Sequence, residues 1–209
     1  MPMGSMEEQL QGLLFVLVGP GGVGKNTLMQ MVLPRFDRLR QLPTATTRTP
    51  RSGEQQGREH LFIGVDEFRR MIADGELIEH EEVHPGKFYG VPRKVVEQTL
   101  ATGEDLIADI EIAGAKKVHE AFPHNTVLIF IAPPSLDVLE ERMENRGETE
   151  AGIAERLARA EREMHFKDCC DYVIVNENLE SASRLLYDVI ASTRKQRDEH
   201  PGVRLISQV

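Results

Sequence analysis

The chain has 209 residues, of which 40% are hydrophobic, and its formal net charge is -9. This size suits one compact domain with a buried core, and the acidic balance disfavours a general binder of nucleic acids or of anionic membranes. No apolar run approaches the roughly 20 residues of a membrane span. The two adjacent cysteines, Cys169 and Cys170, offer no disulfide framework. We therefore expect a cytoplasmic protein with no nucleic-acid or membrane partner, and the sequence leaves its oligomeric state open.

The first predicted elements are a strand, a glycine-rich loop and a helix. Residues 13–18 (LLFVLV) are apolar throughout, as in a strand buried on both faces, and helix-forming residues 27–33 end at Pro34. Between them, residues 19–27 (GPGGVGKNT) come close to the phosphate-binding pattern G-x-x-x-x-G-K-[ST]. Such a loop aims backbone N–H groups and a helix N-terminus at a phosphate, and Lys25 adds a charge. The predicted triphosphate-binding residues are Gly19, Pro20, Gly21, Gly22, Val23, Gly24, Lys25, Asn26 and Thr27.

One position of the loop departs from the pattern. Asn26 stands where a Ser or Thr hydroxyl would hold Mg²⁺. Its side-chain carbonyl is a hard oxygen ligand that Mg²⁺ accepts directly or through water, so we expect a working loop. Asp109 ends the apolar run DLIAD and is expected to be the second residue at the metal. The alternative for Asp109 is a helix N-cap or a surface acid.

Further along the chain, two segments interrupt an alternation of strands and helices. Residues 44–92, rich in Gly, Glu and Arg, predict a small mixed α/β lobe with a helix at 66–73 and a strand at 77–83. Residues 135–168 are almost wholly helical and highly charged, and the polar tail after Arg194 is expected to be loose. Strands are also predicted at 106–109, 127–132 and 172–175, and helices at 95–100, 113–122, 136–146, 153–166 and 179–194. This alternation predicts an α/β doubly wound sheet.

Three further stretches resemble the guanylate kinases, a family of P-loop nucleoside monophosphate kinases. They are ATTRTPRSGEQQGREHLF (45–62), EVHPGKFYGVP (82–92) and the lid motifs RMENRG and ERLARAEREM (142–164). With the loop, DIEIAG and YVIVNENL, the likeness covers residues 12–190. It implies a P-loop doubly wound parallel sheet core (12–43, 93–134 and 171–194), an inserted mixed α/β GMP-binding lobe (44–92), a helical lid (135–168) and a loose tail (195–209).

The resemblance also implies an activity. The protein would transfer the γ-phosphoryl group of ATP to GMP, giving ADP and GDP, with Mg²⁺ as cofactor and the two nucleotides as its partners. Arg48 and Arg51 lie three residues apart in a Pro-containing turn, and their planar groups can grip a phosphate bidentately. Glu79 would read guanine, whose N1–H and 2-amino groups are adjacent donors. The GMP-binding residues implied are Thr44, Arg48, Arg51, His60, Glu79, Tyr89, Val91, Asp109 and Glu111.

Three of these residues differ from the usual pattern of the family. His60 replaces a phosphate-binding tyrosine, Val91 replaces a Ser or Thr near the base, and Glu111 replaces an aspartate. We expect protonated His60 to donate to the GMP phosphate. Val91 leaves open a different acceptor, such as dGMP or IMP.

The lid carries the arginines that the resemblance assigns to the transferred group. Phosphoryl transfer requires positive charge and positioning around the moving phosphate. The catalytic residues implied are Lys25, Arg48, Arg142, Arg146 and Arg156. The alternative for the lid is a solvent-exposed helix whose arginines pair with neighbouring glutamates. We prefer this alternative as the role of Arg159 and Arg162. Asn176, after YVIV, is expected either near the ATP base and ribose or in a simple turn.

Two alternatives belong to other functional classes. A non-catalytic guanylate-kinase-like module would bind a phosphopeptide in the inserted lobe, but such modules usually sit in longer chains beside other domains. The retained lid arginines also favour catalysis. A regulatory GTPase is disfavoured, because the sequence contains no N-K-x-D stretch that would read guanine.

Overall fold

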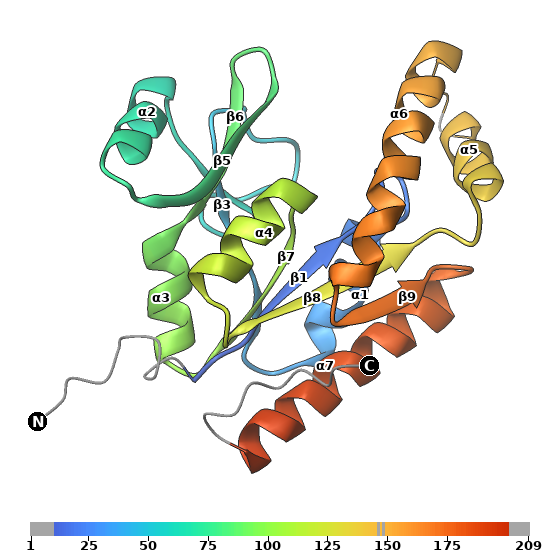
Figure 1. The fold of residues 1–209 in the computed structure, drawn as a ribbon. Helices are drawn as coiled ribbons and strands as arrows, with labels where there is room; N and C mark the ends of the chain where they lie inside the picture. The colour runs from blue at the N-terminus through green and yellow to red at the C-terminus, as the bar shows by residue number, and fades with distance from the viewer. Residues whose placement is uncertain (1–10, 146, 148, 201–209) are drawn as a thin grey trace, which may run out of the picture.

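The computed structural model describes residues 11–145, 147 and 149–200. Within them, the core is a five-stranded parallel sheet with strand order β2-β7-β1-β8-β9 (Figure 1). Its strands are β1 (Leu14–Val18), β2 (Leu39–Gln41), β7 (Asp105–Asp109), β8 (Thr126–Ala132) and β9 (Tyr172–Val175). The predicted doubly wound parallel sheet is therefore confirmed. The chain leaves central strand β1 at the switch point where ligands bind in such sheets.

Helices cover both faces of this sheet. Helices α1 (Lys25–Val32) and α7 (Leu179–Glu199) pack on one face, and α3 (Arg93–Ala101) and α4 (Ile112–Ala121) pack on the other. Successive residues of β1 alternate between the two faces: Phe15 belongs to the first core cluster and Val16 to the second. Because both faces are buried, the strand is apolar throughout. None of the described helices has the combination of length and apolarity needed to cross a lipid bilayer.

The inserted lobe has a sheet of its own, with strand order β4-β3-β6-β5. Its elements are β3 (Thr44–Thr46), β4 (His60–Phe62), α2 (Val65–Ala73), β5 (Leu77–His84) and β6 (Lys87–Pro92). Ala45, Phe68 and Leu77 form a separate small core beneath this sheet. Helix α2 and strand β5 lie within a residue of the predicted positions, whereas β3, β4 and β6 were not predicted.

The lid consists of two helices that follow β8. Helix α5 (Leu136–Glu144) is capped by Ser135, whose side chain accepts from the N–H of Val138. Helix α6 (Glu150–Glu163) begins three residues earlier than predicted because Thr149 accepts from the N–H of Gly152. The 3₁₀ helices η2 (Leu33–Arg35) and η3 (Met164–Cys169) follow α1 and α6. Figure 1 shows the lobe and the lid helices rising from the core on either side.

The C-terminal helix is longer than predicted. Residues 195–199, which were expected to be part of a loose tail, continue α7 to Glu199. The cause is Asp105, whose buried carboxylate accepts from Nε of Arg194 at 2.5 Å and Nη1 of Arg197 at 2.6 Å. The same carboxylate accepts from the backbone N–H of Leu13 at 2.7 Å. This ion-pair network holds the last turns of α7 against the sheet. Of the rest of the expected tail, His200 is the C-cap residue of α7, and 201–209 lie outside the described residues.

We predict that Asp105→Asn is strongly destabilising. The side chain of Asp105 is 2% exposed, and the change would remove the buried counter-ion of two partly buried guanidinium groups, although Arg197 would keep its pair with the exposed Asp198. Breaking such a buried ion pair should lower the free energy of unfolding by about 3 kcal/mol. Urea unfolding measures the loss.

The matched control is Glu104→Gln. Glu104 is the neighbouring residue and also pairs with an arginine, but Arg40 is 65% exposed. The control should therefore lose less than about 1 kcal/mol. Equal losses in the two variants would show that Asp105 does not anchor α7.

Candidate active site

The phosphate loop joins the carboxyl end of β1 to helix α1. Gly24 is the N-cap residue of α1 and has φ 97°, in the left-handed region that glycine adopts without strain. A Cβ atom at this position would lie 2.8 Å from the side-chain nitrogen of Asn176. Because glycine has no side chain to cap the helix, the first-turn N–H groups of α1 are available to bind an anion.

Lys25 lies across this loop. Its Nζ donates to the backbone carbonyl oxygens of Gly19 at 2.6 Å and Pro20 at 3.3 Å, and lies 3.6 Å from Oδ1 of Asp109. Asp109 is close because it ends β7 and pairs with Leu17 of the neighbouring strand β1. Desolvation raises the pKa of Asp109, and the charge of Lys25 opposes that shift. The structure therefore brings together the loop lysine and the acid predicted at the metal.

The residues at this edge fit a nucleotide-bound Mg²⁺. No group of three or more His, Cys, Asp or Glu side chains that could hold a metal is found in the described part of the chain. Mg²⁺ at nucleotide sites does not need one, since it takes one or two protein ligands and fills its shell with water and phosphate oxygens. Asp109 supplies a carboxylate, and Asn26 is an exposed residue in the first turn of α1.

Asn176 supports the phosphate loop from behind. It is 2% exposed, and its Nδ2 donates to the carbonyl oxygen of Val23 at 2.7 Å. Its backbone N–H donates to Ala132 at 2.8 Å, and its buried Oδ1 has no hydrogen-bond partner among the described residues. The side chain predicted to lie near the ATP base or to form a turn thus contacts the backbone of the loop.

The lid reaches the same corner through Arg142. From α5, its Nη2 donates to the carbonyl oxygens of Asn176 at 2.9 Å and Glu177 at 3.1 Å. Arg156 is exposed on α6, and Arg146 lies outside the described residues. One of the three predicted lid arginines is therefore held at the segment after β9, whose Asn176 contacts the phosphate loop.

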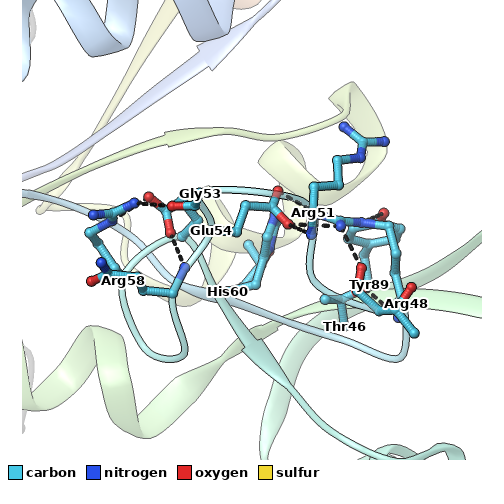
Figure 2. Close-up of polar contacts among 12 residues, drawn as sticks. Thr46, Arg48, Arg51, Gly53, Glu54, Arg58, His60 and Tyr89 are labelled. Carbon is cyan, nitrogen blue, oxygen red and sulfur yellow. Dashed lines mark hydrogen bonds and ion pairs between the residues drawn. The ribbon is translucent and has the colours of Figure 1, made fainter.

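Arg48, in the inserted lobe, is held by a bidentate ion pair (Figure 2). Its Nη1 and Nη2 donate to the two carboxylate oxygens of Glu54, both at 2.8 Å, and its Nε donates to the hydroxyl of Tyr89 at 3.0 Å. The hydrogen bonds from Arg48 and from the backbone N–H of Arg51 lower the pKa of Glu54 to about 2. The guanidinium is thus oriented in advance. A phenol that accepts one bond can still donate its own proton, so Tyr89 can serve a phosphate.

Glu54 was not identified from the sequence. Its only signal is its place six residues after Arg48 in a glycine-containing turn, and several nearby acids, such as Glu59, are comparably placed. The side chain of Arg51 points away from the Arg48–Glu54 pair in Figure 2. The two predicted phosphate-binding arginines therefore differ: Arg48 is held by Glu54, whereas the side chain of Arg51 extends away from this pair.

His60 lies beside this cluster. Its Nδ1 is 2.8 Å from the hydroxyl of Thr44. The centroids of the His60 and Tyr89 rings lie 5.9 Å apart in an edge-to-face arrangement. Burial and the positive charge of Arg48 lower the pKa of His60. Without a ligand, this shift favours the neutral ring; the protonated donor expected at a bound GMP phosphate stays a prediction. When the Thr44 hydroxyl donates to Nδ1, the ring proton lies on Nε2, which then acts as a neutral donor.

Glu79, on β5, packs against helix α4. A Cβ atom added to Gly114 would lie 2.9 Å from both Cδ and Oε2 of Glu79. Burial raises the pKa of Glu79 to about 7, with smaller contributions from Lys117, which opposes the shift, and from the acids Glu81 and Glu111, which add to it. The sequence analysis did not single out Gly114, although a glycine inside a helix can mark such a close approach.

Val91 and Glu111 complete the predicted acceptor residues. Val91 is fully buried in the core and pairs with Glu79 between strands β6 and β5. Glu111 is the N-cap residue of α4, and its Oε2 accepts from Nη2 of Arg159 on α6. Arg159 was predicted to belong to a solvated face. It does pair within its helix, with Glu163 at 2.5 Å, but it also links the lid to α4.

Comparisons with known proteins show which family the chain resembles. A model of the guanylate kinase family matches residues 11–193. The guanylate kinase of Cupriavidus metallidurans is 45% identical over 184 residues, which cover 88% of this chain and 84% of the relative. That of Bacillus subtilis is 42% identical over 190 residues, covering 90% and 92%.

A solved structure shows the same fold. The crystal structure of guanylate kinase from Anaplasma phagocytophilum matches this one with a TM-score of 0.70 and 33% sequence identity. The match covers 93% of both chains, so it includes the core, the lobe and the lid. On these findings, the chain belongs to the guanylate kinase family.

Proposed function

We propose that this protein transfers the γ-phosphoryl group of ATP to GMP, giving ADP and GDP. The observation that carries the proposal is the Arg48–Glu54–Tyr89 cluster, a second phosphate-binding feature in a molecule that already has a phosphate loop. A loop alone indicates a nucleoside-triphosphate site. Two phosphate sites on separate lobes suit a kinase whose acceptor is itself a phosphate, and the relatives are named guanylate kinases.

On the donor side, the loop and its surroundings bind ATP. The first-turn N–H groups of α1 and Lys25 hold the β- and γ-phosphates. Asn26 and Asp109 would hold Mg²⁺, which would neutralise negative charge on the β- and γ-phosphates. Asn176 fixes the loop through the carbonyl oxygen of Val23. Transfer then requires positive charge around the moving group, which Arg142, Arg146 and Arg156 supply from the lid.

On the acceptor side, the lobe binds GMP. Arg48, Arg51, Tyr89 and His60 receive its phosphate, and Glu79 receives the base. Guanine presents N1–H and its 2-amino group as adjacent donors to the carboxylate. Adenine presents a lone pair at N1, so it would leave a desolvated carboxylate unpaired, which discriminates strongly against it.

The proposal predicts an order of acceptors. In a coupled assay with ATP and Mg²⁺, kcat/KM should fall from GMP to IMP, which lacks the 2-amino group, and then to AMP. Glu79→Gln should lower kcat/KM for GMP by about 10- to 150-fold, because hydrogen bonds to a charged group contribute about 1.5–3 kcal/mol. Glu82→Gln, on the same strand but exposed, should stay within about twofold. AMP equal to GMP, or an unaffected Glu79→Gln variant, would overturn the assignment.

The raised pKa of Glu79 predicts a pH dependence. Only the ionised carboxylate accepts both guanine donors, so KM for GMP should fall about tenfold between pH 6 and pH 8, around a pKa of about 7. GMP's own phosphate titrates in this range as well. The control is therefore Glu79→Gln, which keeps the phosphate contribution and should lose the rest of the pH dependence. An unchanged profile in the variant would exclude Glu79 as its source.

The same shift affects stability with a defined sign. The folded-state pKa of Glu79 is raised above the value of 4.5 for an unperturbed glutamate, so the folded protein binds more protons. Its contribution to stability is fully present below about pH 4.5 and is lost as pH rises through about 7. In ligand-free protein, Glu79→Gln should therefore flatten the decline of the thermal midpoint across this window.

Asn26 predicts the metal dependence. Asn26→Ala removes the oxygen offered to Mg²⁺, so the Mg²⁺ concentration for half-maximal rate should rise at fixed total ATP. Asn26→Ser, which restores the usual hydroxyl, should keep kcat within about tenfold, or about 1.4 kcal/mol. An Mg²⁺ titration that is the same for Asn26→Ala and the unmodified protein would show that Asn26 does not serve the metal.

A further inference from the structure

Arg159 connects two carboxylates that belong to different parts of the molecule. Its Nε donates to Glu163 within α6 at 2.5 Å, and its Nη2 donates to Oε2 of Glu111 at the start of α4. The side chain of Glu163 is only 12% exposed, so it gives the guanidinium a fixed base on the lid helix. The second bond then reaches out of the lid to a residue of the core.

The carboxylate reached by Arg159 stands beside the group that reads the base. Glu111 and Glu79 are near enough for the charge of Glu111 to raise the pKa of Glu79. A cleft of about 820 Å³ opens here between the lobe, α4 and α6, and Glu81, Glu111, Arg159 and Arg162 lie on its wall. Arg159 is therefore the lid's charged contact with the acidic side of the acceptor site.

Glu111 has a longer side chain than the residue that the family usually has here. The family usually has an aspartate at this position, and a glutamate carries its carboxylate about one carbon–carbon bond, roughly 1.5 Å, farther from the backbone. The pair uses Oε2 of Glu111. A carboxylate has a second oxygen with its own acceptor sites, so the ion pair leaves Glu111 able to accept from a ligand.

We infer that Arg159 is a positioning residue for the acceptor nucleotide: it holds Glu111 through Oε2 so that Oε1 faces the bound nucleotide, and it thereby ties lid helix α6 to acceptor binding. This inference rests on the proposed function, because it takes Glu111 to be an acceptor-binding residue. ATP binds at the phosphate loop, on other residues. Loss of Arg159 should therefore weaken the binding of GMP and leave the binding of ATP unchanged. A general loosening of the lid would affect both nucleotides.

The test compares Arg159→Gln with Arg162→Gln. Arg162 lies on the same helix and the same cleft wall, and is the matched control. Both partners of the Arg159–Glu111 pair are about half exposed, at 53% and 49%, so the effect is modest. KM for GMP should rise about two- to fivefold in Arg159→Gln, with KM for ATP and kcat within a factor of about 1.5. Calorimetric titration with GMP alone, without ATP, should show the same weakening.

A double-mutant cycle with Glu111 tests whether Arg159 acts by positioning Glu111 or only through a local change in α6. Once Glu111→Gln has removed the charge that Arg159 holds, adding Arg159→Gln should change KM for GMP by less than about 1.5-fold. Additive effects, or an Arg159→Gln variant that matches the Arg162→Gln control, would overturn the inference while GMP remains the substrate of the unmodified protein. Failure of the unmodified protein to phosphorylate GMP would instead overturn the proposed function.

Discussion

The position of β1 between β7 and β8 is the constraint on which the site depends. Parallel pairing brings the carboxyl ends of these strands to one edge, where Leu17 lies opposite Asp109. The phosphate loop leaves β1 at that edge, so Lys25 and Asp109 meet 3.6 Å apart although they are remote in sequence. The lobe and the lid are insertions into this core, and they carry the further charged residues of the proposed site.

The charged groups of the site are held by different means. Arg48 is fixed by the two oxygens of Glu54, whereas Lys25 is bonded to backbone carbonyls of its own loop. A guanidinium that is oriented before its ligand arrives loses less side-chain entropy on binding. Glu79 is the opposite case: burial against α4 makes its charged form less favourable, and a ligand with two donors relieves this. The proposed acceptor site thus combines a guanidinium that is oriented before binding with a carboxylate whose charge is stabilised only when a ligand donates to it.

The sequence predicted four of the five core strands, all except β2, and it predicted the phosphate loop, because those signals are local. Strands β1 and β8 are apolar at nearly every residue, but β2, β3 and β4 have three residues each, too few to show a pattern. Pairings between distant side chains could not be predicted. The chain has 34 acidic residues, and nothing local indicates that Glu54 holds Arg48 or that Glu111 meets Arg159. The bond from Asn176 to the loop likewise depends on how β9 packs beside β8.

Asp105 has a consequence for how the protein is made. Its carboxylate joins the residue before the first core strand to the last helix, so segments from both ends of the fold meet at one buried charge. During synthesis, the residues up to β9 can emerge while Arg194 and Arg197 are still missing. Until they arrive, burying Asp105 carries a desolvation cost with no counter-ion to offset it. Burial of Asp105 is therefore favourable only after the last turns of α7 have been made, and a chain that stops before α7 is complete would expose the apolar face that this helix covers.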